Sequence, residues 1–401
     1  MKDILFFIKK FGVVNFLFVV LTFTNLLGLG YLFGYVAVAL IFFKKEIVVN
    51  ELDITAKVLF LFSLAYALFY YLDPWKGQQF FLIYMLSPTA FYLWGKKIVK
   101  SLKEPDNIIH IMMFLGVIYS LPAMISVLLN ISDGGFAQLE RSIPMFWGGP
   151  AIGATGMAQF FMFNICIPGI FFATIKKLDK TLIIAFSLAF VLSLACVLRV
   201  GSRTLLAILF LSFFIAVVFV SPKLSLKQNV VRYGILAIII VLIVQNISFD
   251  FDSEIFTTFA SRMQEGGVED LAGGGGRVDL WSKSIDYMEI YPFGWDLERF
   301  GYSHNLWLDT FRVGGFPSFT LLIIFSLMVL FILKKLVFSK KIGLTLKLIF
   351  ILYNIAFISI FMVEPGIDGN YSLFIFFCLF SGIMKSSLSS SEKRNGNSRI
   401  N

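Results

Sequence analysis

The sequence predicts an all-α polytopic membrane protein with about 12 transmembrane helices and one large non-cytoplasmic loop before the tenth. Of its 401 residues, 58% are hydrophobic and 15% are charged, whereas soluble domains contain about 45–50% apolar and about 25% charged residues. The mean hydropathy is +0.85. Apolar runs long enough to cross a bilayer recur along the whole chain. Together these observations exclude a soluble globular chain.

The apolar runs define the order of the spans. The spans are predicted near 12–27, 29–43, 55–72, 79–95, 108–129, 154–175, 181–199, 203–220, 230–248, 304–333, 343–362 and 370–386. The first two share a turn at Gly28 and Gly30, so we expect a hairpin there. The tenth is longer than a bilayer needs, and we expect its first turns to lie at the membrane interface. The chain then divides into transmembrane helices 1–9, a loop with short amphipathic helices, transmembrane helices 10–12 and a cytoplasmic tail expected to be disordered, over residues 1–248, 249–302, 303–386 and 387–401.

The lysines and arginines predict the orientation. With the N-terminus in the cytoplasm, 25 of the 34 basic residues fall in cytoplasmic segments, as the positive-inside rule requires. The even number of spans then places both termini in the cytoplasm. The net charge of +9 is therefore a topology signal spread over short loops. It forms no groove-sized patch for nucleic acid, and attraction to anionic membrane lipid is its expected consequence.

The nine basic residues left outside differ in type from those inside. Seven of them are arginine, whereas only three of the 25 inside are. The orientation rule does not favour arginine over lysine, but a guanidinium offers a rigid, bidentate fork for phosphate or carboxylate. A simpler interpretation is that three of these arginines pair with nearby acids, as Arg141–Glu140, Arg262–Glu265 and Arg299–Glu298.

Arg199 and Arg203 lie in a connection of a few residues between two apolar spans. They are therefore held at the membrane surface or slightly within it, where charges are costly and tend to mark functional sites. The alternative is that both side chains snorkel to the lipid headgroups. We favour a functional role for Arg203 and leave both interpretations open for Arg199.

The large loop carries a glycine run, Gly273 to Gly276, followed by Arg277. Backbone N–H groups in such a run can form an anion-binding nest, although glycine runs also serve as hinges. Arg277 would stand at the start of the next segment. That segment has the spacing of an amphipathic helix with its aromatic face towards the membrane, on the basis of Leu280, Trp281, Ile285 and Met288.

The sequence contains two histidines. His110 lies at the cytoplasmic start of a span, and we assign it no role. His304 lies at the outer entrance of the tenth span, with Asn305 beside it. A neutral imidazole can accept a proton from a hydroxyl nucleophile. The alternative for His304 is an ordinary hydrogen bond at a helix N-terminus.

Several short motifs on the predicted outer face follow one another in a fixed order. They are Ser202-Arg203-Thr204, Arg277 with Trp281, Pro292-Phe293-Gly294, Ser303-His304-Asn305-Leu306 and Gly314-Gly315-Phe316. In these motifs, and in its topology, the chain resembles the O-antigen polymerase and O-antigen ligase superfamily. The matching motifs cover 202–204 and 273–320, about an eighth of the chain. Elsewhere only the hydropathy agrees.

The resemblance implies a metal-independent, inverting glycosyltransferase at the periplasmic face of the bacterial inner membrane. Its donor would be a glycan linked to undecaprenyl pyrophosphate, with Arg203 and Arg277 on the pyrophosphate and His304 as the base that activates the acceptor hydroxyl. Arginines suit this donor because a pyrophosphate leaving group needs positive charge and no protonating acid. We expect neither a metal nor a cofactor. The candidate substrate-binding residues are Arg141, Arg199, Gly276, Tyr302, Asn305 and Arg312.

Polymerase and ligase differ in the acceptor, which is a lipid-linked repeat unit for the polymerase and the lipid A core for the ligase. We favour the polymerase because segment 131–153, with Arg141, Trp147 and several glycines, could hold a second glycan. A polymerase could also bind a protein that regulates chain length. The rivals from other classes are a flippase for the same lipid-linked units and a non-catalytic scaffold. Unusual charges gathered at one membrane face argue against the flippase, because transporters place such charges near the bilayer midplane.

Overall fold

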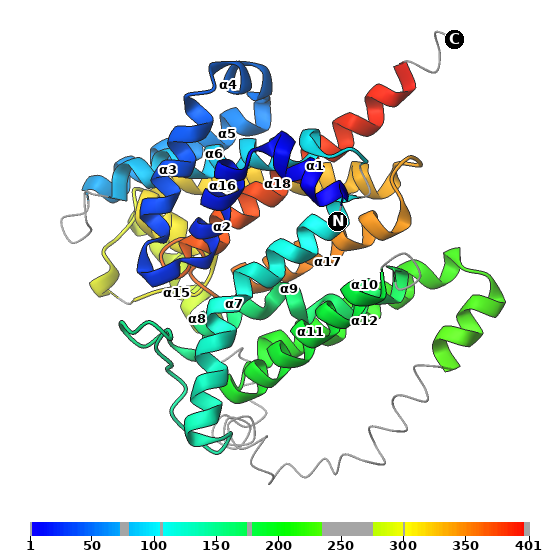
Figure 1. Ribbon diagram of the computed structural model, residues 1–401. Coiled ribbons are helices and arrows are strands. Elements are labelled where there is room, and N and C mark those ends of the chain that lie inside the picture. Colours follow the sequence, from blue (N-terminus) through cyan, green and yellow to red (C-terminus); the bar gives the residue numbers. More distant parts are fainter. Residues whose placement is uncertain are drawn as a thin grey trace. The chain divides into compact units, whose positions relative to one another are not determined.

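The computed structural model describes residues 2–72, 80–104, 107–174, 179–234, 276–299 and 301–396, and these are predominantly helical (Figure 1). The predicted all-α class is therefore confirmed. The chain forms two compact units. The first comprises 1–119, 272–343 and 360–401, and the second comprises 120–271 and 344–359. Helices α7 (Ile108–Gly134) and α17 (Leu344–Phe361) each contribute residues to both units.

The first unit begins with four short helices. These are α1 (Lys2–Phe11), α2 (Val13–Thr24), α3 (Gly30–Phe42) and α4 (Lys45–Glu51). Helices α2 and α3 pack against each other as the expected hairpin. In the turn between them, Asn25 adopts a left-handed conformation (φ +44°), and its Oδ1 accepts a hydrogen bond of 2.8 Å from Gly30 N. This side chain closes the turn because asparagine tolerates that conformation.

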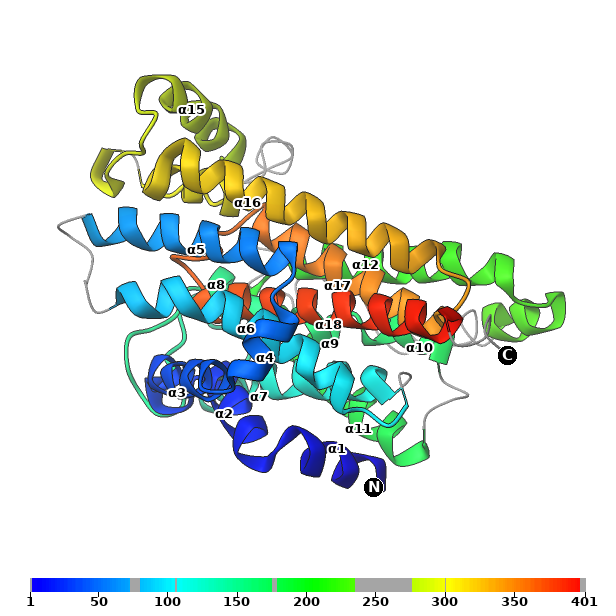
Figure 2. The ribbon, with the colours of Figure 1, turned by 90° about the horizontal axis from the view of Figure 1, so that it is seen from above.

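Four longer helices form the main layer of the first unit: α5 (Ile54–Leu72), α6 (Phe81–Ser101), α16 (Leu306–Phe338) and α18 (Tyr371–Gly396). They run side by side (Figure 2). Helices α6 and α18 approach closely, since a Cβ on Gly382 would collide with the backbone of Tyr92. Small residues allow such tight helix crossings in membranes. Helix α18 continues to Gly396, so the segment predicted as a tail begins as helix.

The second unit contains α8 (Ala154–Ala158), α9 (Met162–Ile165), α10 (Ile167–Thr174), α11 (Lys180–Val200) and α12 (Arg203–Val220). Helix α10 packs along α12, and α9 contacts both α11 and α12 (Figure 1). Buried Asn164 donates hydrogen bonds to Ser120 Oγ at 2.7 Å and to Ser193 Oγ at 2.9 Å. These bonds between helices satisfy polar groups that would otherwise be costly in an apolar core.

Eight of the described helical segments are long and apolar enough to cross a membrane, and each coincides with a predicted span. Predicted spans 12–27 and 29–43 correspond to helices of only 12 and 13 residues. Span 79–95 lies in α6, which carries three lysines. Most of span 230–248 lies beyond residue 234, outside the described residues. The structure therefore supports a multi-pass membrane protein, and the count of 12 stays a prediction.

Candidate functional site

His304 lies immediately before α16, in a backbone conformation that few residues adopt. Its φ is +51°, where residues other than glycine are uncommon and often mark functional sites. Asn305 then caps the helix, because its Oδ1 accepts hydrogen bonds from Trp307 N at 3.1 Å and Leu308 N at 3.2 Å. The His304 imidazole is 40% exposed. The cap therefore presents a histidine at the start of the helix, within reach of a ligand. Contact of Asn305 itself with a substrate stays a prediction.

Asp309, in the first turn of α16, holds the backbone on both sides of His304. Its buried carboxylate accepts hydrogen bonds from Ser303 N at 2.8 Å and from Asn305 N at 3.0 Å. A hydrogen bond to a charged group contributes about 1.5–3 kcal/mol. A left-handed residue other than glycine costs about 1–3 kcal/mol. The two bonds to Asp309 therefore offset the backbone strain at His304.

Glu364 brings Arg277 and His304 together. Its Oε1 lies 3.1 Å from Nη2 of Arg277, and its Oε2 lies 3.8 Å from Nδ1 of His304. The second distance suits an ion pair and is too long for a hydrogen bond. Glu364 is buried, whereas the Arg277 side chain is 19% exposed. A carboxylate beside Nδ1 leaves Nε2 as the imidazole nitrogen that is available to a ligand.

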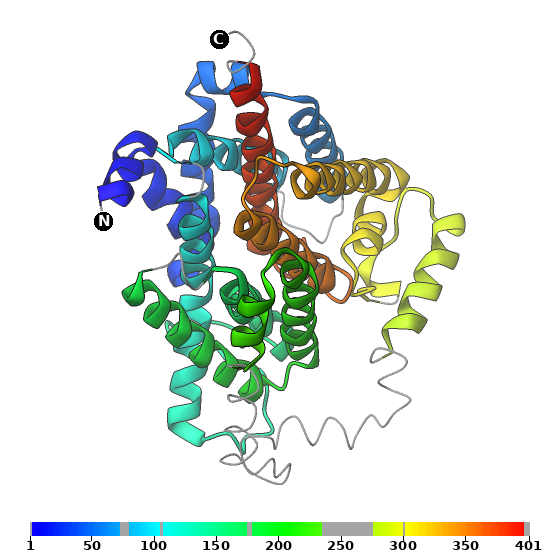
Figure 3. The ribbon, with the colours of Figure 1, turned by 90° about the vertical axis from the view of Figure 1, so that its right-hand side faces the viewer.

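Helix α15 (Arg277–Ile290) has Arg277 as its first residue and packs against α16 (Figure 3). Buried Ser284 shares a hydrogen bond of 2.6 Å with Ser303, next to His304. Arg277 and Ser284 are two turns apart and lie on the same helix face. A helix is therefore present where the sequence predicted one, with its inward face set by these residues, and its amphipathic character with an aromatic face towards the membrane stays a prediction. Ile285, which we expected on the apolar face, is exposed.

Arg312, a predicted substrate-binding residue, is buried and forms an ion pair with Asp368. Its Nε lies 4.0 Å from Oδ1 of Asp309, and Tyr66 donates a hydrogen bond of 2.9 Å to Asp368 Oδ1. The Tyr302 ring centre lies 5.3 Å from the Arg312 guanidinium. Burial and the Asp368 carboxylate raise the pKa of Tyr302, and Arg312 opposes this rise. The guanidinium charge of Arg312 is thus already paired with a carboxylate inside the protein. Contact of Arg312 or Tyr302 with a substrate stays a prediction.

Two of the sequence motifs meet where α16 is kinked. The kink lies at Gly315 (φ +55°), and Phe316 N donates a hydrogen bond of 3.0 Å to Pro292 O. A Cβ at Gly315 would collide with the backbone of Phe293. Gly294 has φ +99°, which strains any other residue. Motifs 292–294 and 314–316 therefore form one backbone contact, and this contact holds the first turns of α16 in place.

Arg203 belongs to the second unit, where it is the first residue of α12. Ser202 caps this helix by accepting a hydrogen bond of 3.4 Å from Leu205 N. Arg277 is likewise the first residue of α15. A cation at a helix N-terminus destabilises the helix because the helix dipole is positive there, and the same end attracts anions. Both arginines therefore lie at a helix end where a cation is unfavourable, and at Arg277 the Glu364 carboxylate offsets this cost.

Arg199 and Arg141 tie the loop after α7 to the turn between α11 and α12. Arg199 is wholly buried and donates to the carbonyl oxygens of Gln138 at 3.3 Å and Glu140 at 2.9 Å. Arg141 donates from Nε and Nη2 to the Val200 carbonyl at 3.0 and 2.9 Å. The complete burial of Arg199 contradicts the snorkelling alternative. Both arginines order this loop, and their contact with a substrate stays a prediction.

The glycine run is described only at its last member. Gly276 precedes α15 with φ +75°, a conformation that suits glycine. Residues 235–275, which contain Arg262 and the first part of the predicted loop, lie outside the described residues. The anion-binding nest, and a substrate contact at Gly276, therefore stay predictions. Within the described ranges, no group of three or more His, Cys, Asp or Glu side chains is placed to hold a metal ion.

Sequence reasoning did not single out Glu364, Asp309 or Asp368. A signal was nevertheless present. A buried arginine needs a carboxylate partner, and the short connection between α17 and α18 carries two acids, Glu364 and Asp368. What the sequence did not show is which arginine each acid would meet.

Neither a protein-family model nor a curated protein matches this sequence. The functional assignment therefore rests on the geometry around His304 and on the resemblance in short motifs.

Proposed function

We propose that this protein is an O-antigen polymerase, a membrane glycosyltransferase that moves a growing glycan from undecaprenyl pyrophosphate to a lipid-linked repeat unit. The observation that carries the proposal is the assembly of Arg277, Glu364 and His304 at the start of α16. Arg277 and His304 both belong to the motifs in which the chain resembles the polymerase and ligase superfamily. In the proposed topology, about 12 spans cross the bacterial inner membrane, both termini are cytoplasmic, and this assembly faces the periplasm.

In the proposed reaction, His304 is the general base. The acceptor hydroxyl gives its proton to the imidazole while its oxygen attacks the anomeric carbon of the donor sugar. The bond from that carbon to the pyrophosphate oxygen breaks on the opposite side, and its electron pair leaves with undecaprenyl pyrophosphate. The configuration is therefore inverted. Glu364, 3.8 Å from Nδ1, stabilises the imidazolium that forms, as a carboxylate does for other catalytic histidines.

Arg277 and Arg203 have a separate role in this proposal, which is to receive the charge that develops on the leaving group. Glu364 holds the Arg277 guanidinium in place. The resemblance assigns Arg203 to the same pyrophosphate. Each arginine adds its fork of donors to the positive end of a helix dipole. Positive charge of this kind suffices for a pyrophosphate leaving group, so the proposed step needs neither a metal nor a protonating acid.

The loop after α7 is the surface that we propose for the second glycan of a polymerase. Arg199 and Arg141 hold its backbone, and Ile143 and Ile152 form an antiparallel bridge within it. An ordered surface of this kind suits an enzyme that must hold two glycans at once. The ligase, whose acceptor is the lipid A core, is the second candidate. A flippase for lipid-linked repeat units is the candidate from another class.

Deletion of the gene, followed by electrophoresis of lipopolysaccharide, tests the proposal. We expect a core that carries a single repeat unit, because the ligase remains active. A bare core with accumulating lipid-linked polymer would identify a ligase instead. Loss of all periplasmic glycan would identify a flippase. Complementation with His304→Ala should leave the single-repeat phenotype unchanged while the variant is present in the membrane at the wild-type level.

A further inference from the structure

A groove opens in the first unit between the start of α5, the second half of α16 and the second half of α18. Its volume is about 580 Å³, within the range of roughly 300–1,000 Å³ that ligand sites have. The walls are mainly apolar and include Ile54, Leu327, Met328 and Phe331. Leu327 and Phe331 are 60% and 56% exposed. The groove is therefore open along the side of a helix that is apolar enough to cross the membrane.

Two lysines stand at one end of this groove. Lys335, in the last turn of α16, and Lys385, on α18, both line it, together with Ser389. Lys335 lies about three turns further along α16 than Ile324, which lines the apolar part. Its Nζ lies 4.7 Å from the centre of the Phe331 ring. Neither lysine forms an ion pair with a carboxylate in the part of the chain that the structure describes.

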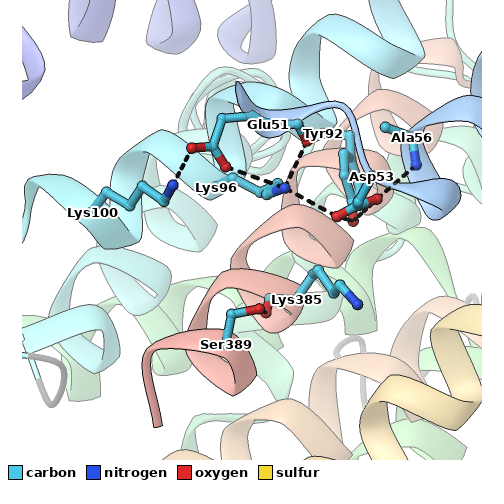
Figure 4. A network of polar contacts seen from close by, with 8 residues as sticks. All are labelled: Glu51, Asp53, Ala56, Tyr92, Lys96, Lys100, Lys385 and Ser389. Carbon is cyan, nitrogen blue, oxygen red and sulfur yellow. Dashed lines mark hydrogen bonds and ion pairs between the residues drawn. The ribbon is translucent and has the colours of Figure 1, made fainter. Parts of the chain in front are cut away.

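Figure 4 draws Lys385 together with two acids, Glu51 and Asp53, and both acids are already paired with other lysines. Lys96 Nζ lies 3.2 Å from Glu51 Oε2 and 3.0 Å from Asp53 Oδ2, and Lys100 pairs with Glu51. Two carboxylates and two ammonium groups thus balance one another. The Lys385 side chain lies beside this cluster without a contact to it. The described residues therefore leave the charges of Lys335 and Lys385 uncompensated at the groove.

We propose that this groove binds one anionic phospholipid. The phosphodiester lies between the ammonium groups of Lys335 and Lys385. One acyl chain follows α16 past Met328 and Leu327. Lysines near a bilayer surface attract anionic headgroups, and basic pockets between transmembrane helices recognise them. A lipid fits better than a soluble anion because the apolar wall is open along a membrane-spanning helix. The proposal is independent of the glycan-transfer function.

Native mass spectrometry of the detergent-solubilised full chain tests this site. The protein is titrated with phosphatidylglycerol or with phosphatidylcholine of the same acyl chains. We expect one phosphatidylglycerol per chain, bound at least about tenfold more tightly than phosphatidylcholine. Each lysine near a bilayer surface contributes roughly a fivefold gain in affinity, so Lys335→Gln with Lys385→Gln should weaken phosphatidylglycerol binding roughly 25-fold. Replacement of both by arginine should preserve binding.

A matched control removes the same charge from the same end of α16. Lys334→Gln with Lys340→Gln affects two exposed lysines that do not line the groove, and we expect it to leave the affinity unchanged. Leu327→Trp fills the apolar wall while keeping every charge, and it should reduce binding. Equal weakening by the control pair, unchanged binding by Leu327→Trp, or no preference of the wild type for phosphatidylglycerol would each overturn the proposal. If the glutamine pair does not fold, Leu327→Trp and the arginine pair decide the question.

Discussion

Arg199 and Arg141 in the second unit have different kinds of partner from Arg277 in the first unit. In the second unit, Arg199 and Arg141 donate to backbone carbonyl oxygens, and Arg199 is wholly buried. In the first unit, Arg277 shares a carboxylate with the part-exposed His304. An arginine on the predicted outer face is therefore not by itself a sign of ligand binding. Its partner and its exposure distinguish an arginine that orders a loop from one that can meet a substrate.

The largest effect on glycan transfer is expected at the imidazole of His304, in the first unit. His304→Ala should reduce glycan transfer roughly 10³-fold, within the range of general-base catalysis. His304→Asn is the matched control for the backbone, because asparagine tolerates the left-handed conformation. It should be equally inactive and should keep the melting temperature of the wild type. The length distribution of lipopolysaccharide measures the activity. Full activity of either variant would remove His304 as the base.

The next largest effect is on the free energy of unfolding, and it compares Arg199 in the second unit with Arg277 in the first. Arg199→Ala should lower the free energy of unfolding by about 3 kcal/mol, because it removes two hydrogen bonds that a buried, charged donor makes to the loop after α7. Arg277→Ala combined with Glu364→Ala should lower it by less than about 1 kcal/mol, because removal of both members of the ion pair leaves no buried charge without a partner. Thermal unfolding in one detergent measures both variants. A similar loss for the two would show that they have the same structural role.

The third prediction asks whether glycan transfer depends on the positive charge of Arg203 and Arg277 or on the bidentate shape of their guanidinium groups. Arg203→Lys and Arg277→Lys keep the positive charge and remove the bidentate fork. Each should reduce glycan transfer about 100-fold, comparable with the loss of one donor to a developing oxyanion. The melting temperature should not fall. Near-normal transfer by Arg203→Lys would favour snorkelling as the reason for its position.

The smallest effect on glycan transfer is expected at Glu364, whose carboxylate contacts both Arg277 and His304. Glu364→Gln keeps the shape and removes the charge, 3.8 Å from His304 Nδ1. Glycan transfer should fall roughly tenfold, because an ion pair at this distance in part-exposed surroundings is worth only about 1–2 kcal/mol. Transfer assays at saturating donor, with the melting temperature alongside, measure this effect. An unchanged rate would show that Glu364 positions Arg277 alone.

Hydropathy determined the fold class because the bilayer acts on each span separately. A spanning helix needs about 20 consecutive apolar residues, so the signal is local, and eight described helical segments lie where spans were predicted. The two helices of the short N-terminal hairpin have only 12 and 13 residues. By the same length criterion, they are not shown to cross the bilayer. Residue type and position also selected Arg277 and His304, and the structure places both side chains beside Glu364. Their role in catalysis stays a prediction.

The sequence by itself thus determined the helical membrane class and the residues around which a site could form. Only the tertiary structure decided which charged groups meet. Arg277 and Glu364 are 87 positions apart, and Arg199 is bound to carbonyl oxygens that carry no sequence signature. The physical reason is that a buried charge must find its partner through space. That partner is set by helix packing, by the kink at Gly315 and by the cap that holds His304, and not by any local pattern of residues.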